Sequence, residues 1–149
     1  MYRKILVSTD GSRLSDRAVK EATLLAKAVD AKLVLFHVLP PVRQPIYSEG
    51  SSALIGIGSR SKARKAAAAQ ARRVLAAAGK KAEAAGVAAT KDYAVSASPH
   101  DGIVAAAQKH RCDLIVMASH GRRGLSRFLL GSETQAVLSR ARVPVLVVR

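Results

Sequence analysis

Apolar positions along the chain fall into short continuous runs that alternate with longer stretches in which apolar residues recur every three or four positions. The short runs predict strands at residues 5–7, 33–39, 87–95, 114–118 and 143–148. The longer stretches predict helices, one beginning after residue 12 and the others near 62–86, 98–110 and 132–140. The run from Leu33 to Leu39 is apolar at nearly every residue, which is typical of a strand covered on both faces.

Strands and helices therefore alternate along the chain. This order is typical of the α/β class, with an open, mostly parallel five-stranded sheet, helices on both faces and right-handed crossovers. A chain of 149 residues is the usual size of one domain, and we see neither a repeat nor a linker. We expect a single Rossmann-like domain over residues 1–149.

Three connections between the predicted elements carry specific signals. The turn Ser8-Thr9-Asp10-Gly11-Ser12 is rich in residues that cap helices, and Asp10 in it can cap the first helix, contact a ligand, or do both. Ser98 and Pro99 predict the cap and the first turn of the third helix. Residues 42–61 contain one proline, three glycines and five serines, which predict a long surface loop.

The formal net charge of +15 fits an anionic partner: nucleic acid, anionic lipid or a phosphorylated small molecule. On the second predicted helix, five cations share one stripe: Lys62, Lys65, Arg72, Arg73 and Lys80. The opposite face is apolar: Ala67, Ala71, Val74, Ala78 and Ala85. A solvated outer face explains the stripe best, and a nucleic-acid or membrane surface is the alternative. The stripe has no interleaved aromatic residues, so we expect at most weak, sequence-independent binding to nucleic acid.

The sequence shows neither a membrane-spanning run nor a signal peptide. No apolar run approaches the roughly 20 residues that span a bilayer, and the first residues lead into a strand rather than a signal peptide. We therefore expect a soluble, cytoplasmic protein without a membrane partner. Cys112 is the single cysteine and begins an apolar run, so we expect a buried thiol without a functional role.

Polar residues and glycines gather where the predicted strands end. Ligands of open α/β sheets bind at the carboxyl ends of the strands, near the point where the strand order reverses. The candidates at these ends are Ser8, Thr9 and Asp10 after the first strand, Val38 in the second, and Met117, Ala118, Ser119, His120 and Gly121 at the fourth. We expect these three edges to line one crevice.

The stretch between the fourth strand and the last helix has the chemistry of a phosphate site. Gly121 lets backbone N–H groups approach a ligand closely, and Gly131 and Ser132 begin a helix whose free N–H groups favour an anion. Ser132 and Thr134 add hydroxyl groups. Three cations lie between the glycines, namely Arg122, Arg123 and Arg127. Neither G-x-x-x-x-G-K-[ST] nor G-x-G-x-x-G occurs, and a glycine-rich turn without a ligand is the alternative interpretation.

The histidines do not predict a metal site built by the protein. His37 lies inside an apolar strand and is expected to be hydrogen-bonded in the core or the crevice. His100 and His110, at the two ends of a predicted helix, lack acidic or cysteine partners at ligand spacing. His120 fits a turn as well as a ligand contact. A divalent ion, Mg²⁺ or Mn²⁺, could arrive with the phosphates of a nucleotide.

Four stretches of the chain resemble the universal stress protein family: ILVSTDGS, LFHV, DLIVMASHGRRGLSRFLLGS and PVLVV. Nucleotide-binding members carry Gly, two residues, Gly, nine residues, Gly and then Ser or Thr. Gly121, Gly131 and Ser132 match this pattern, and Ala118 stands in the place of the first glycine. The resemblance implies an adenine nucleotide α-hydrolase-like fold that binds ATP.

The resemblance also assigns roles to residues. It implies that Asp10 and the backbone around Val38 contact adenine or ribose, and that Gly121, Gly131 and neighbouring residues hold the phosphates. No residue is predicted to be catalytic. The full set of candidate nucleotide-binding residues is Ser8, Thr9, Asp10, Val38, Met117, Ala118, Ser119, His120, Gly121, Arg122, Gly131, Ser132, Glu133 and Thr134.

Three functions stay open at this point. The favoured one is an ATP-binding regulatory protein of the stress response. The second is a slow ATPase or phosphotransferase, in which Asp10 would orient the attacking group, although no phosphate-binding lysine or second carboxylate accompanies the loop. The third is a protein that binds no nucleotide, or a basic nucleic-acid binder, favoured by Ala118 and by the net charge.

The last predicted strand favours a homodimer. Residues 143–148 are apolar almost to the end of the chain, and as an edge strand they would expose an adhesive row of backbone groups. Pairing with the same strand of a second copy would cover that edge. The resemblance to the family implies the same assembly.

Overall fold

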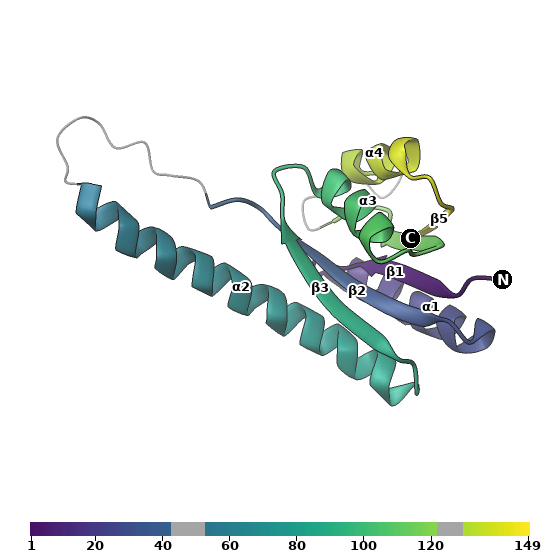
Figure 1. The fold of residues 1–149 in the computed structure, drawn as a ribbon. Helices are drawn as coiled ribbons and strands as arrows, with labels where there is room; N and C mark the ends of the chain where they lie inside the picture. The colour runs from purple at the N-terminus through teal and green to yellow at the C-terminus, as the bar shows by residue number, and fades with distance from the viewer. Residues whose placement is uncertain (43–52, 122–129) are drawn as a thin grey trace.

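The computed structural model describes residues 1–42, 53–121 and 130–149. The strands in these ranges are β1 (Lys4–Ser8), β2 (Lys32–Leu39), β3 (Ala89–Val95), β4 (Leu114–Ala118) and β5 (Val145–Val148). The helices are α1 (Arg13–Val29), α2 (Ala53–Ala84), α3 (Pro99–Lys109) and α4 (Ser132–Arg140). Strands and helices alternate, and the predicted α/β fold is confirmed (Figure 1).

The strands form one parallel sheet in the order β3-β2-β1-β4-β5. β1 lies at its centre, where Ile5 is opposite Leu33 of β2 on one side and Leu114 of β4 on the other. From β1 the chain proceeds outwards to β3, and it then returns across β1 to place β4 on the other side. The strand order therefore reverses between β1 and β4.

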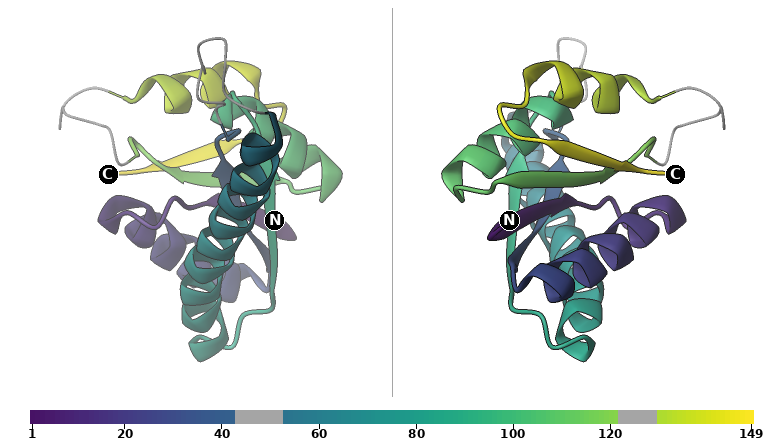
Figure 2. Two further views of the ribbon diagram at one scale, coloured as in Figure 1. Left: turned by 90° about the vertical axis from the view of Figure 1, so that its left-hand side faces the viewer. Right: turned by 90° about the vertical axis from the view of Figure 1, so that its right-hand side faces the viewer.

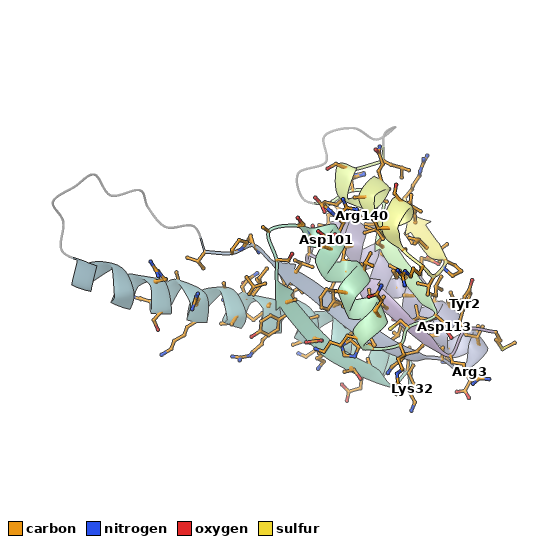
Figure 3. All side chains as sticks on the ribbon, turned by 45° about the horizontal axis from the view of Figure 1, so that its top comes forward. Tyr2, Arg3, Lys32, Asp101, Asp113 and Arg140 are labelled. Atoms are coloured by element: carbon orange, nitrogen blue, oxygen red, sulfur yellow. The ribbon has the colours of Figure 1, made fainter. Side chains whose placement is uncertain are left out.

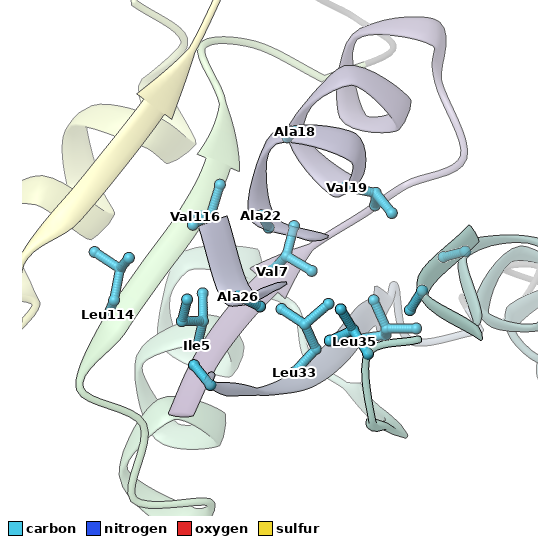
Figure 4. Close-up of a cluster of buried hydrophobic side chains, with 14 of the residues drawn as sticks. Ile5, Val7, Ala18, Val19, Ala22, Ala26, Leu33, Leu35, Leu114 and Val116 are labelled. Carbon is cyan, nitrogen blue, oxygen red and sulfur yellow. The ribbon is translucent and has the colours of Figure 1, made fainter. Parts of the chain in front are cut away.

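Helices cover both faces of this sheet (Figure 2). On one face, α1 and α2 pack against the apolar residues Ile5, Val7, Leu33, Leu35, Leu114 and Val116 (Figure 4). On the other face, α3 and α4 pack against Leu6, Val34, Phe36, Ile115 and Met117. Successive side chains of a strand point to opposite faces, so a strand buried on both faces has to be apolar throughout, as the sequence of β2 predicts.

Small side chains bring α1 close to the sheet. Ala18, Ala22 and Ala26 are completely buried and follow one another at helical spacing. A methyl group occupies little space between a helix and a sheet, so the helix axis can approach closely. Leu25 and Val29 of the same helix are partly buried beside this core.

The structure moves several predicted boundaries. Residues 53–61 are helical, so the prediction of a loop over 42–61 is wrong in its second half. Glycines and serines are typical of loops. Each residue added to an existing helix gains one hydrogen bond, however, so the helix can extend through them. β3 and β5 each begin two residues later than predicted. Pro144, directly before β5, has no N–H to donate to a sheet ladder.

α2 has the predicted division into a polar and an apolar face. The five stripe cations, Lys62, Lys65, Arg72, Arg73 and Lys80, are all exposed. On the opposite face, Ala71, Val74 and Ala78 are buried. The helix has 32 residues and is therefore about 48 Å long, and its first turns extend beyond the sheet (Figure 1).

The amino ends of β1 and β4 are tied together by one carboxylate. Asp113 accepts hydrogen bonds from the backbone N–H groups of Arg3 at 2.8 Å and Lys4 at 3.1 Å (Figure 3). This contact fixes the two central strands at the edge opposite the carboxyl ends. Within the described ranges, no helix combines the length and the apolar character that crossing a membrane requires.

We expect the Leu35→Ala variant to lose about 2 to 5 kcal/mol of unfolding free energy, because Leu35 is completely buried in the α1/α2 side of the core. The matched control is Leu24→Ala, since Leu24 is 51% exposed, and it should change stability by less than about 0.5 kcal/mol. Urea unfolding followed by circular dichroism measures both variants. Equal losses in both would contradict the assigned core.

Cys112 is buried, as predicted, and this burial raises the pKa of its thiol to about 11. The thiolate is the reactive form, so we expect native Cys112 to react with a thiol reagent at pH 8 about a hundredfold more slowly than the urea-unfolded chain. The native rate should rise as the pH approaches the pKa. Stopped-flow absorbance over a pH series measures both rates, and equal rates at pH 8 would refute the buried thiol.

Candidate functional site

The sheet places its candidate site at the carboxyl ends of β1 and β4. These strands are neighbours, and their following connections lead to helices on opposite faces, α1 after β1 and α4 after β4. The two loops therefore leave the sheet towards opposite faces, and this is the position at which open α/β sheets form a ligand-binding crevice. Thr9 and Asp10 follow β1, and residues 119–121 follow β4.

The turn after β1 is held by its own side chains. Asp10 Oδ1 accepts a hydrogen bond from the backbone N–H of Ser12 at 2.9 Å. Ser12 Oγ then caps α1 by accepting from the N–H of Ser15 at 3.2 Å. The predicted capping by Asp10 is therefore wrong, because Ser12 is the cap and Asp10 forms the turn before it. Gly11 has a φ of 75°, a conformation that favours glycine.

Buried polar groups connect this turn with β2. Thr9 and Ser15 share a hydrogen bond between their hydroxyl groups at 3.1 Å. His37 Nδ1 lies 2.7 Å from the carbonyl oxygen of Thr9, so Nδ1 carries the proton in this contact. The prediction of a hydrogen-bonded, buried His37 is confirmed. Ser8, the last residue of β1, is half-buried and lies opposite Phe36.

The backbone of Val38 faces the crevice. Thr9 N–H donates to Phe36 O at 2.9 Å, and Ser96 N–H donates to Leu39 O at 2.9 Å. Backbone groups of successive residues in a strand point to alternate sides, so the even-numbered residues of β2 face β1 and the odd-numbered ones face β3. β1 ends opposite Phe36, and Val38 therefore directs its N–H and C=O beyond the end of β1.

The turn after β4 packs tightly against the start of α4. Gly131 N–H donates to Ser119 O at 2.8 Å. The Thr134 hydroxyl lies 3.1 Å from the carbonyl oxygens of both Ala118 and Ser119, and Thr134 is almost completely buried. Ser119 Oγ lies 3.2 Å from His120 Nδ1. The hydroxyl of Thr134 therefore holds the turn in place.

Gly131 has a structural reason to be glycine. A Cβ atom there would lie 3.3 Å from Ser119 O and 3.4 Å from two carbon atoms of His120. Its φ of −61° is open to any residue, so the close approach of the backbone is the reason for glycine, and not the conformation. Ala118 and Met117 are buried, and Met117 packs in the α3/α4 side of the core.

Gly121 brings the two strand-end loops together. A Cβ atom on Gly121 would lie 3.0 Å from Asp10 Oδ2. The predicted candidates from the β1 turn and the β4 turn are therefore neighbours in space. Arg122, as well as Arg123 and Arg127, lies outside the described residues.

The first turn of α4 presents backbone donors at the same place. Its N-cap is Gly131, and no described side chain caps the helix. The first helical hydrogen bond is donated by Gln135 to Gly131 O, which leaves the N–H groups of residues 132–134 without helical acceptors. Such groups and the positive end of the helix dipole favour an anion. Ser132 is exposed there and adds a hydroxyl group.

Glu133 points away from these donors towards α3. Its Oε2 accepts from the backbone N–H of His100 at 2.8 Å and lies 2.8 Å from His100 Nδ1. Asp101, next in α3, pairs with Arg140 of α4 at 2.7 Å (Figure 3). These contacts fix α4, and with it the phosphate-binding candidates, to the amino end of α3.

His100 and His110 have acidic partners in the structure that come from distant positions in the sequence, whereas the prediction concerned partners at ligand spacing. His100 pairs with Glu133, and His110 Nε2 lies 2.7 Å from Asp92 Oδ2. Burial by itself would raise the pKa of Asp92, but hydrogen bonds from Lys109 and His110 lower it below its ordinary value. Across the described ranges, no three histidine, cysteine or acidic side chains come together as a metal site.

Comparison with known proteins shows one family over the whole chain. The model of the universal stress protein family matches residues 1–149. The universal stress protein MJ0531 of Methanocaldococcus jannaschii is 37% identical over 152 residues, which cover 100% of this chain and 83% of that protein. YxiE of Bacillus subtilis is 33% identical over 158 residues, which cover 100% of both proteins.

Solved structures agree with this result. MJ0577 of Methanocaldococcus jannaschii superposes with a TM-score of 0.83 at 28% identity, covering 99% of this chain and 96% of the other. A universal stress protein in complex with cAMP superposes with a TM-score of 0.71 at 32% identity, covering 99% of this chain and 97% of the other.

Proposed function

The chain belongs to the universal stress protein family, and from this premise we propose that it binds an adenine nucleotide, ATP, in the crevice between β1 and β4. The observation that carries the proposal is the meeting of Asp10, Gly121 and the first turn of α4, which no described side chain caps, at the point where the strand order reverses. The cAMP complex of a relative that is 32% identical supports an adenine nucleotide as the ligand class.

The phosphates would lie against the amino end of α4. The N–H groups of residues 132–134, which have no acceptor within the helix, and the hydroxyl of Ser132 are the donors, and Gly121 adds no side chain beside them. Thr134 and Gly131 keep these donors in place through the turn after β4. Arg122, which lies outside the described residues, follows Gly121 in the sequence and would add positive charge.

The base and the ribose would lie against β1 and β2. The backbone N–H and C=O of Val38 face this side of the crevice and can hydrogen-bond the edge of an adenine. The Asp10 carboxylate is a suitable acceptor for a ribose hydroxyl, and its place beside Gly121 fits a ligand that extends from β2 to α4. A divalent ion, Mg²⁺ or Mn²⁺, would be held through oxygens of the phosphates.

The chemistry of the described crevice favours binding over turnover. Phosphoryl transfer needs a positioned metal, a charge clamp and a group that orients the attacking oxygen. Among the described residues, Asp10 is the one carboxylate of the crevice, because Glu133 is directed to His100. We therefore expect hydrolysis of ATP to be slow or absent, and regulation by bound nucleotide to be the role.

The Gly121→Val variant tests the nucleotide site. The branched side chain would stand beside Asp10 Oδ2, 3.0 Å from the Cβ position, so we expect at least about a hundredfold weaker ATP binding. The matched control is Gly58→Val, where a Cβ atom meets no described atom within 4 Å, and its affinity should be unchanged. Isothermal titration calorimetry measures the dissociation constants, with circular dichroism as the check on folding.

In the same series, Ala118→Gly should change the dissociation constant by less than about tenfold. Its methyl group is buried in the α1/α2 side of the core, so its loss does not alter the crevice. Native mass spectrometry of the purified protein should show bound adenine nucleotide. A clean apoprotein that also ignores added ATP would refute the proposal.

The same family membership supports a homodimer through β5. β5 is an edge strand beside β4, and its Leu146 is 41% exposed. Ser119 N–H donates to Val148 O and Ile115 N–H donates to Pro144 O, so the even-numbered residues of this segment face β4. Val145 and Val147 therefore direct their backbone groups outwards, where the same strand of a second copy can pair with them.

We expect the protein to sediment as a dimer at about 10 µM and the Val147→Pro variant to sediment as a monomer. Proline removes the outward N–H of residue 147, while the hydrogen bonds to β4 involve residues 144 and 148. Analytical ultracentrifugation measures the mass, and an unchanged circular dichroism spectrum shows that the sheet is intact. A dimeric, folded proline variant would contradict pairing through β5.

A further inference from the structure

The helix layer formed by α1 and α2 contains a groove that the nucleotide site does not use. Both helices lie on the same face of the sheet (Figure 2). The groove between them has a volume of about 450 Å³. It is lined by Arg13, Asp16, Arg17, Lys20, Thr23, Leu24, Lys81 and Ala85. The cations of α2 can be recognised in the sequence, but this groove cannot, because it exists only where the two helices meet.

One wall of the groove is a row of cations. Arg13, Arg17 and Lys20 follow one another at steps of four and three residues along α1, and all three are exposed. These steps correspond to about 6 Å and 4.5 Å along a helix, so the three charges lie on one side of α1. Of the four cations in the groove, only Lys81 forms an ion pair with a described residue, Asp16 at 2.6 Å. This pair joins the two helices, and the side chains of Arg13, Arg17 and Lys20 can therefore contact a ligand.

Two apolar residues also line the groove. Leu24 of α1 is 51% exposed, and Ala85 follows the end of α2. The Thr23 hydroxyl donates to Val19 O at 2.7 Å and is therefore occupied within α1. Leu24 lies four residues after Lys20 and therefore continues the stripe of cations along α1. Exposed apolar and charged side chains thus lie next to each other in the groove, as they do in protein–protein interfaces.

We propose that this groove binds an acidic, amphipathic helical segment of a protein partner. Carboxylates one helical turn apart have the spacing of Arg13, Arg17 and Lys20, and leucine-like side chains of the same segment would cover Leu24 and Ala85. Duplex nucleic acid is the weaker fit. Its phosphates would match the cations, but it presents no apolar surface to Leu24.

A designed peptide tests the proposal without knowledge of the natural partner. The probe is the fluorescein-labelled peptide Glu-Glu-Leu-Leu-Glu-Glu-Leu-Leu-Glu-Glu, and fluorescence anisotropy measures its binding to the whole protein at about 0.15 M salt. One control peptide has serine in place of every leucine, and a second has lysine in place of every glutamate. Binding of the probe at least about tenfold tighter than both controls is the expected result.

Variants locate the binding on the protein. We expect the Arg17→Gln/Lys20→Gln double variant and the Leu24→Ser variant each to weaken probe binding about tenfold or more. The matched control is Arg111→Gln/Arg142→Gln, which removes the same charge from the opposite side of the sheet, beside α3 and β5, and should change binding less than twofold. All of these side chains are exposed, and circular dichroism confirms that each variant is folded. ATP affinity should be unchanged in the Leu24→Ser variant.

Four results would overturn the proposal. They are the absence of probe binding, equal binding of the serine peptide, equal loss in the Arg111→Gln/Arg142→Gln control, and binding of the probe that does not depend on Leu24. A duplex DNA of about 20 base pairs serves as competitor. If it binds more tightly than the probe and loses affinity in the Arg17→Gln/Lys20→Gln variant, the groove is a nucleic-acid surface instead.

Discussion

Pairing of β1 on both sides is the constraint from which the rest of the structure follows. Buried backbone groups need hydrogen-bond partners, and the central position of β1 satisfies them through β2 on one side and β4 on the other. Because both neighbours are parallel to β1, all three strands end at the same edge. Their following helices lie on opposite faces of the sheet, so the loops after β1 and β4 diverge, and polar residues gather in the space between them.

Local patterns predicted the strands and helices, but the arrangement of the site required the topology. The continuous apolar run from Leu33 to Leu39 predicted strand β2, because a strand covered on both faces has few polar positions. The start of α2 was not predicted, because Gly56 and Gly58 are typical of loops even where a helix continues through them. The pairing of His100 with Glu133 joins residues 33 positions apart, and no spacing rule within one helix predicts it.

The glycine pattern of the β4–α4 connection has two physical origins. A Cβ atom at Gly131 would crowd the backbone of Ser119 and His120, and a Cβ atom at Gly121 would crowd the Asp10 carboxylate. The first contact belongs to the turn and the second to the candidate site. A sequence pattern records both as glycine, so the sequence alone left a ligand site and a bare turn as alternatives. The atoms near each such Cβ position distinguish the two reasons for glycine, and these atoms are known only from the structure.

The length of α2 has a consequence for how the molecule opens. Buried side chains on this helix begin at Ala71, and none of its described residues before Ala71 is buried. Tertiary packing supplies most of the stability of a helix in a protein, so amide hydrogen exchange should be fast in the first turns and slow from Ala71 onwards. Local stability therefore differs along this one helix, low in its first turns and high from Ala71 onwards. Whole turns inserted before Ala71 would lengthen the projection while the sheet kept its register.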